Sequence, residues 1–243
     1  MKKIVNYLIT TLKGFFMGIA ELLPGISGST IALLFRVYEH IVISAKAITS
    51  LGFWKNPIQE IKKHELYKIF LLIFTMGLGV ALFSKLIVFI FENYTEVFNL
   101  LIGICMILIA LFIYLREKSK IYSVQSLMPL LVGLLLGFLL EKLNITETEI
   151  SLFTLFIAGI VAFSFFIVPG ISGSAILVSL GLYEMIIKAI STIDLTILLP
   201  FGFGCLISLI ILPRIILRIY FNNKVELNNF FAGLIFISGI FLF

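Results

Sequence analysis

Long apolar stretches separated by short charged loops occupy most of this chain and place it in a membrane. Hydrophobic residues make up 61% of the 243 residues, charged residues only 13%, and the mean hydropathy is +1.19. Soluble domains carry about 25% charged residues, so an ordinary soluble domain is excluded. A membrane-crossing helix needs about 20 apolar residues. We therefore predict an all-α integral membrane protein that forms one polytopic domain over 1–243, with no stretch left for a soluble catalytic domain.

The formal charge of +5 and the pI of about 9.2 do not indicate nucleic-acid binding. The basic residues sit in short loops and form no face with interleaved aromatic residues, so topology and an anionic ligand explain them better. Cys105 and Cys205 lie in separate apolar segments without nearby ligand-type residues. We expect no metal, no cofactor and no nucleic-acid partner. The sequence leaves the oligomeric state open, a homo-oligomer included.

A seven-residue motif occurs twice and divides the chain into two similar halves. Pro24-Gly25-Ile26-Ser27-Gly28-Ser29-Thr30 recurs as Pro169-Gly170-Ile171-Ser172-Gly173-Ser174-Ala175, and Tyr38-Glu39 recurs at the same spacing as Tyr183-Glu184. We predict a first repeat over about 4–116, a connecting helix over about 126–141 and a second repeat over about 150–243.

Each Pro-Gly pair interrupts an apolar region and predicts two helical legs joined at a break. The legs run over about 4–23 and 26–50 in the first repeat and about 151–168 and 171–190 in the second. Proline lacks an N–H and disfavours helix at the residue before it, and the following glycine loosens the backbone further. The other apolar segments, which we expect to cross the membrane once each, are about 66–91, 97–115, 126–141, 195–213 and 228–243.

The basic residues decide between a hairpin and a single interrupted crossing at each break, because Lys and Arg concentrate in cytoplasmic loops. Hairpins with a cytoplasmic N-terminus place most of the 18 basic residues in the cytoplasm, whereas single crossings would put the Lys-rich loop 55–68 outside. With hairpins, the first unit opens from the cytoplasm and the second from outside. The predicted fold thus has two inverted-topology repeats, each with a broken-helix (re-entrant) hairpin plus transmembrane helices, as in many transporters.

The start of the second leg in each hairpin is the candidate binding site. A helix start leaves about four backbone N–H groups without intrahelical partners and carries the positive end of the helix dipole, so it can bind an anion. Glycine allows a ligand close to the backbone, and the hydroxyls can cap the helix or donate to phosphate oxygens. The candidate phosphate-binding residues here are Pro24, Gly25, Ser27, Gly28, Ser29, Thr30, Pro169, Gly170, Ser172, Gly173 and Ser174. The alternative, that the motif only kinks and caps packed helices, is less favoured because the motif is doubled.

Arg36 is a further phosphate-binding candidate, because ionisable residues within membrane segments are costly and mark functional sites. It follows Ser29 by seven residues, so we expect both on one helix face, with the guanidinium within reach of the phosphate. Snorkelling or pairing with Glu39 is the alternative. The second repeat has Gly181 at the matching position, so the repeat itself does not require an arginine.

Three acidic residues are candidates for proton coupling. Glu21 precedes the first break, where the second repeat has Phe166, while Glu39 and Glu184 lie nearer the ends of the second legs, each after a supporting tyrosine, Tyr38 or Tyr183. A structural hydrogen bond for Glu21 and interface anchoring for the other two acids are the alternatives.

The run Gly18-Ile19-Ala20-Glu21-Leu22-Leu23-Pro24-Gly25-Ile26-Ser27-Gly28-Ser29-Thr30, with its second copy and Gly181-Leu182-Tyr183-Glu184, resembles the bacterial polyprenyl-phosphate transporter family. The resemblance covers nearly the whole chain. It implies a flippase in the bacterial cytoplasmic membrane that returns undecaprenyl phosphate, the lipid carrier of peptidoglycan synthesis, to the cytoplasmic leaflet. It implies a polyprenyl-phosphate lipid as partner and no enzymatic activity.

A weaker resemblance leaves an enzyme as the alternative. Glu21-Leu22-Leu23-Pro24 and the Ser-rich turn are similar to the BacA-type undecaprenyl-pyrophosphate phosphatases. Those enzymes place an arginine where this chain has Gly173 and a second acid near the first turn, where Glu21 has no acidic neighbour. A phosphatase must activate a nucleophile and stabilise transition-state charge, so we rank hydrolysis below transport, and a non-transporting scaffold third.

Overall fold

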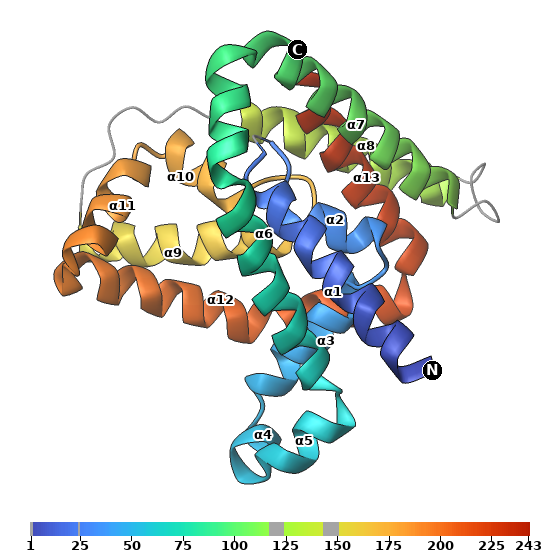
Figure 1. Ribbon diagram of the computed structural model, residues 1–243, viewed down its shortest axis with the longest axis vertical. Helices are drawn as coiled ribbons and strands as arrows, with labels where there is room; N and C mark the ends of the chain where they lie inside the picture. The colour runs from blue at the N-terminus through green and yellow to red at the C-terminus, as the bar shows by residue number, and fades with distance from the viewer. Residues whose placement is uncertain (1, 24, 117–123, 143–150) are drawn as a thin grey trace.

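The computed structural model consists of α-helices throughout the parts it describes, residues 2–23, 25–116, 124–142 and 151–243 (Figure 1). The predicted all-α fold is confirmed. The helices are α1 (Lys2–Glu21), α2 (Gly28–Leu34), α3 (Tyr38–Ile48), α4 (Leu51–Lys55), α5 (Pro57–Lys63), α6 (Leu66–Asn93), α7 (Thr95–Arg116), α8 (Val124–Glu141), α9 (Leu152–Ile167), α10 (Gly173–Ser179), α11 (Tyr183–Thr192), α12 (Leu195–Asn222) and α13 (Lys224–Ile240).

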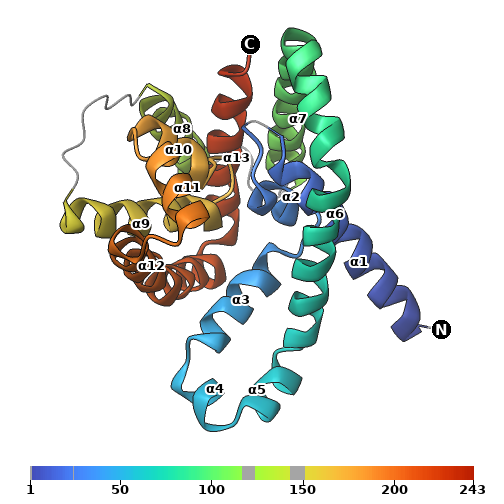
Figure 2. The ribbon, with the colours of Figure 1, turned by 60° about the vertical axis from the view of Figure 1, so that its left-hand side comes forward.

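The same order of helices occurs in both halves. A long helix (α1 or α9) is followed by two short ones (α2 and α3, or α10 and α11) and then by two further long helices (α6 and α7, or α12 and α13). Within each half the first helix packs on the following long helix, α1 on α6 and α9 on α12 (Figure 2). The helices α4 and α5 are an addition to the first half, and α8 links the halves. The inverted orientation of the halves and the proposed repeat boundaries stay predictions.

The breaks occur at the two motifs, as predicted, but the second leg of each unit is not one helix. The chain leaves α1 after Glu21 and begins α2 at Gly28, and it leaves α9 after Ile167 and begins α10 at Gly173. The single helices expected over 26–50 and 171–190 are wrong, because each is divided into two. In the second half, α10 and α11 meet at an angle of 112°.

A left-handed residue causes the extra break in each leg. Arg36 has φ 59° and Gly181 has φ 67°, and each ends its short helix. The next residue, Val37 or Leu182, donates its N–H to the carbonyl five positions earlier, at 2.9 Å in both copies. This is the Schellman arrangement that ends helices at a left-handed residue. The internal repeat therefore extends to the backbone hydrogen bonds beyond the motif.

The long helices make this a multi-pass membrane protein. Among the described residues, α6, α7 and α12 are long and apolar enough to cross a membrane, and the bent pair of α10 and α11 would make a fourth span. The described part of α8 and the whole of α9 are shorter apolar helices. The last helix, α13, forms the centre of the fold, because Phe231, Leu234 and Ile235 are almost completely buried.

Glycines allow the paired helices to approach closely, as small residues do in membrane proteins. A Cβ atom on Gly18 of α1 would lie 2.0 Å from the carbonyl oxygen of Met76 on α6. In the second half, a Cβ atom on Gly159 of α9 would lie 2.0 Å from the carbonyl oxygen of Phe201 on α12. In both helix pairs the two backbones are in contact. Any residue larger than glycine at Gly18 or Gly159 would push the helices apart.

The two Pro-Gly turns meet inside the protein. The hydroxyl oxygen of Thr30, which is fully buried, accepts a hydrogen bond from the N–H of Gly170 at 3.0 Å. Gly170 has φ 106°, and a Cβ atom there would lie 2.7 Å from Cβ of Leu234 and 2.8 Å from N of Ile235. Only glycine fits this turn against α13. The turns of the two halves and α13 therefore share one core.

Replacing Thr30 by valine should destabilise the fold. Valine keeps the shape but leaves the buried N–H of Gly170 without its acceptor, which costs about 1–3 kcal/mol. For a chain of this size we expect the midpoint of thermal unfolding in detergent to fall by about 2–4 °C per kcal/mol.

The matched control is Thr192→Val, which removes an exposed hydroxyl that donates only to Lys188 of its own helix. Equal midpoints for Thr30→Val and Thr192→Val would show that the contact between the turns contributes little.

Candidate functional site

The serines of both turns form the same pair of hydroxyls. Ser27 Oγ lies 2.7 Å from Ser29 Oγ, and Ser172 Oγ lies 2.7 Å from Ser174 Oγ. Ser27 and Ser172 stand at the N-cap positions of α2 and α10, yet neither side chain caps its helix. The hydroxyls therefore bond to one another rather than to the helix start. Pro24, also a candidate, lies outside the described residues, while Pro169 is buried beside Gly170.

A carboxylate of the protein lies against the start of α2. Glu21 Oε1 accepts a hydrogen bond from the N–H of Gly28 at 2.6 Å, and a Cβ atom on Gly28 would lie 2.5 Å from this oxygen. Gly28 thus permits the close approach that we expected a ligand to make. Because α2 and α10 have only seven residues each, local N–H groups and hydroxyls are the relevant donors, not a long helix dipole. Phe166 replaces Glu21 in the second repeat.

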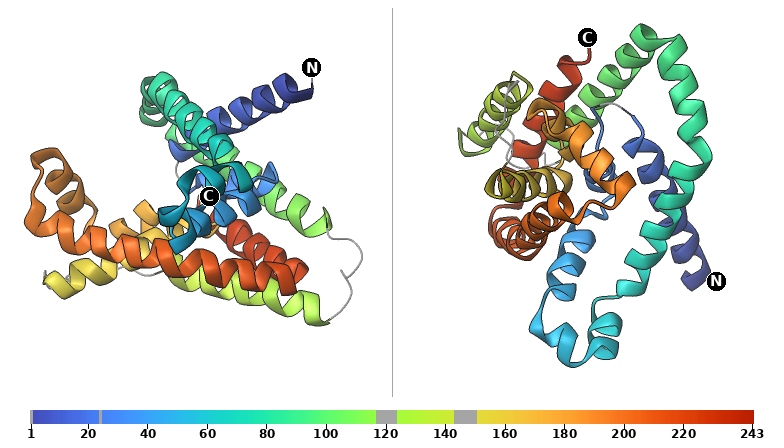
Figure 3. Two further views of the ribbon diagram at one scale, coloured as in Figure 1. Left: turned by 90° about the horizontal axis from the view of Figure 1, so that it is seen from below. Right: turned by 90° about the vertical axis from the view of Figure 1, so that its left-hand side faces the viewer.

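An apolar groove of about 570 Å³ includes this turn in its lining. Its walls come from α1, α3, α6 and the end of α9, and include Met17, Ile69, Ile73, Met76, Gly77, Val80, Ala81, Phe166 and Ile167. The polar side chains that line it belong to Glu21, Ser29 and Tyr38, and Gly28 contributes backbone. The right-hand view of Figure 3 shows α6 along the edge of the fold. The groove thus combines a hydrocarbon-like wall with the polar groups of one turn.

Arg36 is not part of this groove. The expected position on the same helix face as Ser29 is wrong, because α2 ends at Leu34 and the left-handed conformation of Arg36 turns the chain away. Arg36 instead lines a separate cavity of about 240 Å³ together with Glu39. Sequence reasoning missed two further basic residues of this cavity, Arg116 and Lys224.

The three acidic candidates are not brought together. Glu21 lies in the groove, Glu39 lines the smaller cavity, and Glu184 is exposed at the start of α11 beside Tyr183, which is 39% exposed. Tyr38 lines both the groove and the smaller cavity. The two Tyr-Glu pairs thus have different surroundings although the motif repeats.

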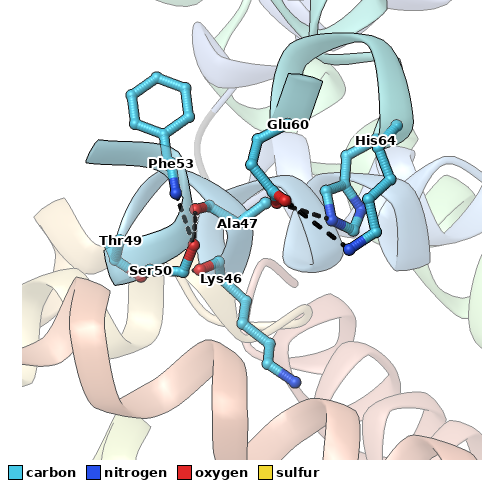
Figure 4. Close-up of polar contacts among 8 residues, drawn as sticks. Lys46, Ala47, Thr49, Ser50, Phe53, Glu60 and His64 are labelled. Carbon is cyan, nitrogen blue, oxygen red and sulfur yellow. Dashed lines mark hydrogen bonds and ion pairs between the residues drawn. The ribbon is translucent and has the colours of Figure 1, made fainter. Parts of the chain in front are cut away.

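Contacts with α12 fix α3, which carries Tyr38 and Glu39. Two nitrogens of Arg214 on α12 donate to the hydroxyl and the carbonyl oxygen of Thr49, each at 3.0 Å. Figure 4 shows the following turn, where Ser50 Oγ accepts from the N–H of Phe53 at 3.2 Å and begins α4. The hydrogen bonds between Arg214 and Thr49 join the first half of the chain to the second.

Metal-binding geometry is not found in the described parts of the chain. No group of three or more His, Cys, Asp or Glu residues there could hold a metal ion. Cys105 and Cys205 are free cysteines.

These features define a class, the multi-pass all-helical membrane proteins with paired broken helices and an apolar groove lined in part by a polar turn. The chain belongs to the undecaprenyl phosphate translocase-like family, since the family model described as "VCA0040-like: Undecaprenyl phosphate translocase-like" matches residues 17–243.

Two curated relatives agree with this assignment. A protein of Vibrio cholerae serotype O1 named polyprenyl-phosphate transporter is 31% identical over 220 residues, which cover 88% of this chain and 70% of the relative. A protein of Staphylococcus aureus with the same name is 30% identical over 251 aligned positions, covering 95% of this chain and 83% of the relative. No solved structure matches the chain.

Replacing Arg36 by glycine should stabilise the fold. A residue with a side chain in the left-handed conformation costs about 1 kcal/mol, and glycine occupies the matching position 181. We expect the midpoint of thermal unfolding to rise by about 2–4 °C.

Arg36→Ala is the matched control, because it removes the same charge but keeps a Cβ atom. A midpoint raised by both variants alike would attribute the gain to charge rather than to the backbone, and a fall with Arg36→Gly would contradict the prediction.

Proposed function

We propose that this protein is a transporter that moves a polyprenyl phosphate, the undecaprenyl phosphate carrier lipid, across the bacterial cytoplasmic membrane. The proposed direction is from the outer to the cytoplasmic leaflet, so that the carrier is recycled in cell-envelope synthesis. The family and the names of both relatives support a polyprenyl-phosphate substrate. The observation that carries the proposal is the apolar groove whose lining includes the polar groups of the first turn.

The groove matches the two chemically different parts of such a lipid. Moving a bare phosphate through hydrocarbon has a large desolvation cost, so the headgroup needs hydrogen-bond donors in place of water. The prenyl chain needs only an apolar surface, which α1, α3 and α6 supply. Gly28 and Ser29 supply an N–H and a hydroxyl beside this apolar wall. A lipid in the groove would therefore place its headgroup at the turn and its chain along α6.

The proposed headgroup site uses the turns of both halves. Because the turns are joined by the Thr30–Gly170 hydrogen bond, their hydroxyl pairs can act on one headgroup in sequence or together. The proposed donors are the backbone N–H groups and hydroxyls of Ser27, Gly28, Ser29, Thr30, Ser172, Gly173 and Ser174. Gly25, Pro169 and Gly170 belong to the same turns, and Pro24 stays a candidate by its place in the motif.

Movement of the two halves would expose the turns alternately to the two sides. We propose inverted repeats over about 4–116 and 150–243, linked by a helix over about 126–141, with the N-terminus in the cytoplasm. The unequal exposure of the matching serines supports this mechanism, because Ser27 is buried where Ser172 is partly exposed, and Ser29 is partly buried where Ser174 is exposed. Rocking of one half against the other would exchange these environments.

Glu21 would couple the movement to protons. Its carboxylate already holds the N–H of Gly28, so an arriving phosphate meets a like charge at the same donor. Protonation of Glu21 would remove the repulsion and free the donor, and deprotonation would expel the headgroup. Glu39 and Glu184 are secondary candidates, because neither lines the groove.

Hydrolysis is not favoured by any observation on the described residues or by the relatives, which are named transporters. We therefore propose that the chain is not an enzyme, and the first experiment tests this directly.

The decisive experiment uses purified protein in liposomes with labelled undecaprenyl phosphate or pyrophosphate, and follows leaflet exchange and released phosphate together. We expect exchange of the monophosphate without phosphate release. Gly77→Leu should slow exchange at least tenfold, because it extends into the groove from a position with no neighbouring atom within 4 Å.

Gly202→Leu is the matched control, since Gly202 also has no atom within 4 Å but lies on α12, outside the groove.

The hydroxyls of the two turns are tested in the same liposomes by combining Ser29→Ala with Ser174→Ala, which should slow exchange as well. Release of phosphate from the pyrophosphate, or equal exchange in both leucine variants, would refute the proposal.

Glu21→Gln should make exchange independent of a proton gradient. Glutamine keeps an acceptor for the N–H of Gly28 but cannot titrate, so imposed gradients of either direction should leave its rate unchanged. The wild type should respond to the gradient. The same dependence in Glu21→Gln and wild type would exclude this residue as the coupling group.

A further inference from the structure

The smaller cavity lies where three chain segments from both halves converge. It is formed by the junction of α2 and α3, the end of α7 and the passage from α12 to α13. In Figure 1 the end of α7 and the start of α13 lie on the same side of the fold, at the right of the view. Its volume of about 240 Å³ is less than half that of the groove, and it shares only Tyr38 with it.

The lining of this cavity has an excess of positive charge. Among the described residues that line it, Arg36, Arg116 and Lys224 supply three cations and Glu39 supplies one carboxylate. The ammonium group of Lys224 also lies 4.9 Å from the ring centre of Tyr220. Arginine and lysine around a small cavity are a typical combination for a phosphate group, because guanidinium forks and ammonium groups give charge-assisted hydrogen bonds.

Arg36 is held there at a conformational cost. Its left-handed backbone would suit glycine, and the matching residue of the second half is Gly181. The ammonium group of Lys13 donates to the carbonyl oxygen of Phe35 at 2.8 Å, which adds positive charge next to Arg36. The backbone conformation does not favour an arginine at this position, and the cations around it outnumber the carboxylate of Glu39, so an anionic ligand would give Arg36 a role.

A buried hydroxyl supplies an independent indication of a ligand. Tyr38 is 2% exposed, and among the described residues its hydroxyl has no hydrogen-bond partner. Its ring packs edge-on against Phe231 of α13, with ring centres 5.6 Å apart, so the side chain is held in place. A buried hydroxyl without a partner costs about 1–3 kcal/mol. An anion oxygen in the cavity that Tyr38 lines would accept its hydrogen bond.

We propose that this cavity is a second anion site, which binds a phosphomonoester group through Arg36, Arg116, Lys224 and the hydroxyl of Tyr38. It is separate from the hairpin turns, and Tyr38 lies in the wall between the two. Both a lipid headgroup and free phosphate have the required chemistry. Naming the lipid headgroup as the source rests on the proposed function, whereas the anion site itself does not.

The test is equilibrium dialysis of radiolabelled inorganic phosphate against the purified full-length protein in a phosphate-free detergent buffer. We expect saturable binding that weakens at least tenfold in the double variant Arg116→Gln with Lys224→Gln. The control Lys188→Gln, which removes an exposed lysine of α11, should bind as the wild type does.

A second variant keeps the test decisive if the double variant does not fold. Glu39→Gln removes the carboxylate from the cavity, so it should strengthen phosphate binding several-fold, a gain that misfolding cannot produce. No saturable binding by the wild type, or unchanged affinity in Glu39→Gln and in a folded double variant, would overturn the proposal.

Competition identifies the source of the phosphate. Displacement of labelled phosphate by farnesyl phosphate, but not by farnesol, would assign the site to a prenyl-phosphate headgroup. Phosphate binding that farnesyl phosphate does not displace would assign it to free phosphate. Because binding is measured without transport, phosphate binding without leaflet exchange would reject the proposed function and keep the anion site.

Discussion

A hydrogen bond between Thr30 and Gly170, made in the core beside α13, ties the two halves of the chain together at their turns. It joins the two broken-helix turns directly, and it does so where the backbone of Gly170 touches α13 so closely that no side chain fits. A buried N–H and a buried hydroxyl must pair with each other, because water cannot replace either partner. The positions of both turns are thereby linked, and with them the groove at the first turn.

Tyr38 lines two cavities of the protein. On one side lies the groove, whose apolar wall suits a prenyl chain, and on the other lies the basic cavity with Arg36 and Lys224. Both are close to α3, which Arg214 of α12 holds through Thr49. A shift of the second half relative to the first would therefore act on both cavities at once, a property expected of a protein that passes a headgroup between environments.

Much of the fold was predictable because the relevant signals are local in the sequence. The apolar stretches gave the helices, and the proline and glycine of each motif gave the breaks before Gly28 and Gly173. The second break in each leg was not predicted, although Gly181 was a signal for it. Its partner at the matching position is an arginine, and a left-handed arginine is not suggested by helix propensity or hydropathy.

The sequence by itself determined the membrane location, the doubled motif and the family, since composition, spacing and motif residues are read without knowing which segments touch. Only the tertiary structure decided which residues share a site. It placed the carboxylate of Glu21 on the N–H of Gly28, and it separated Arg36 from Ser29 and grouped it with Arg116 and Lys224. These placements depend on the left-handed conformation of Arg36 and on packing between helices that are distant in the sequence. Neither is encoded in a local sequence pattern.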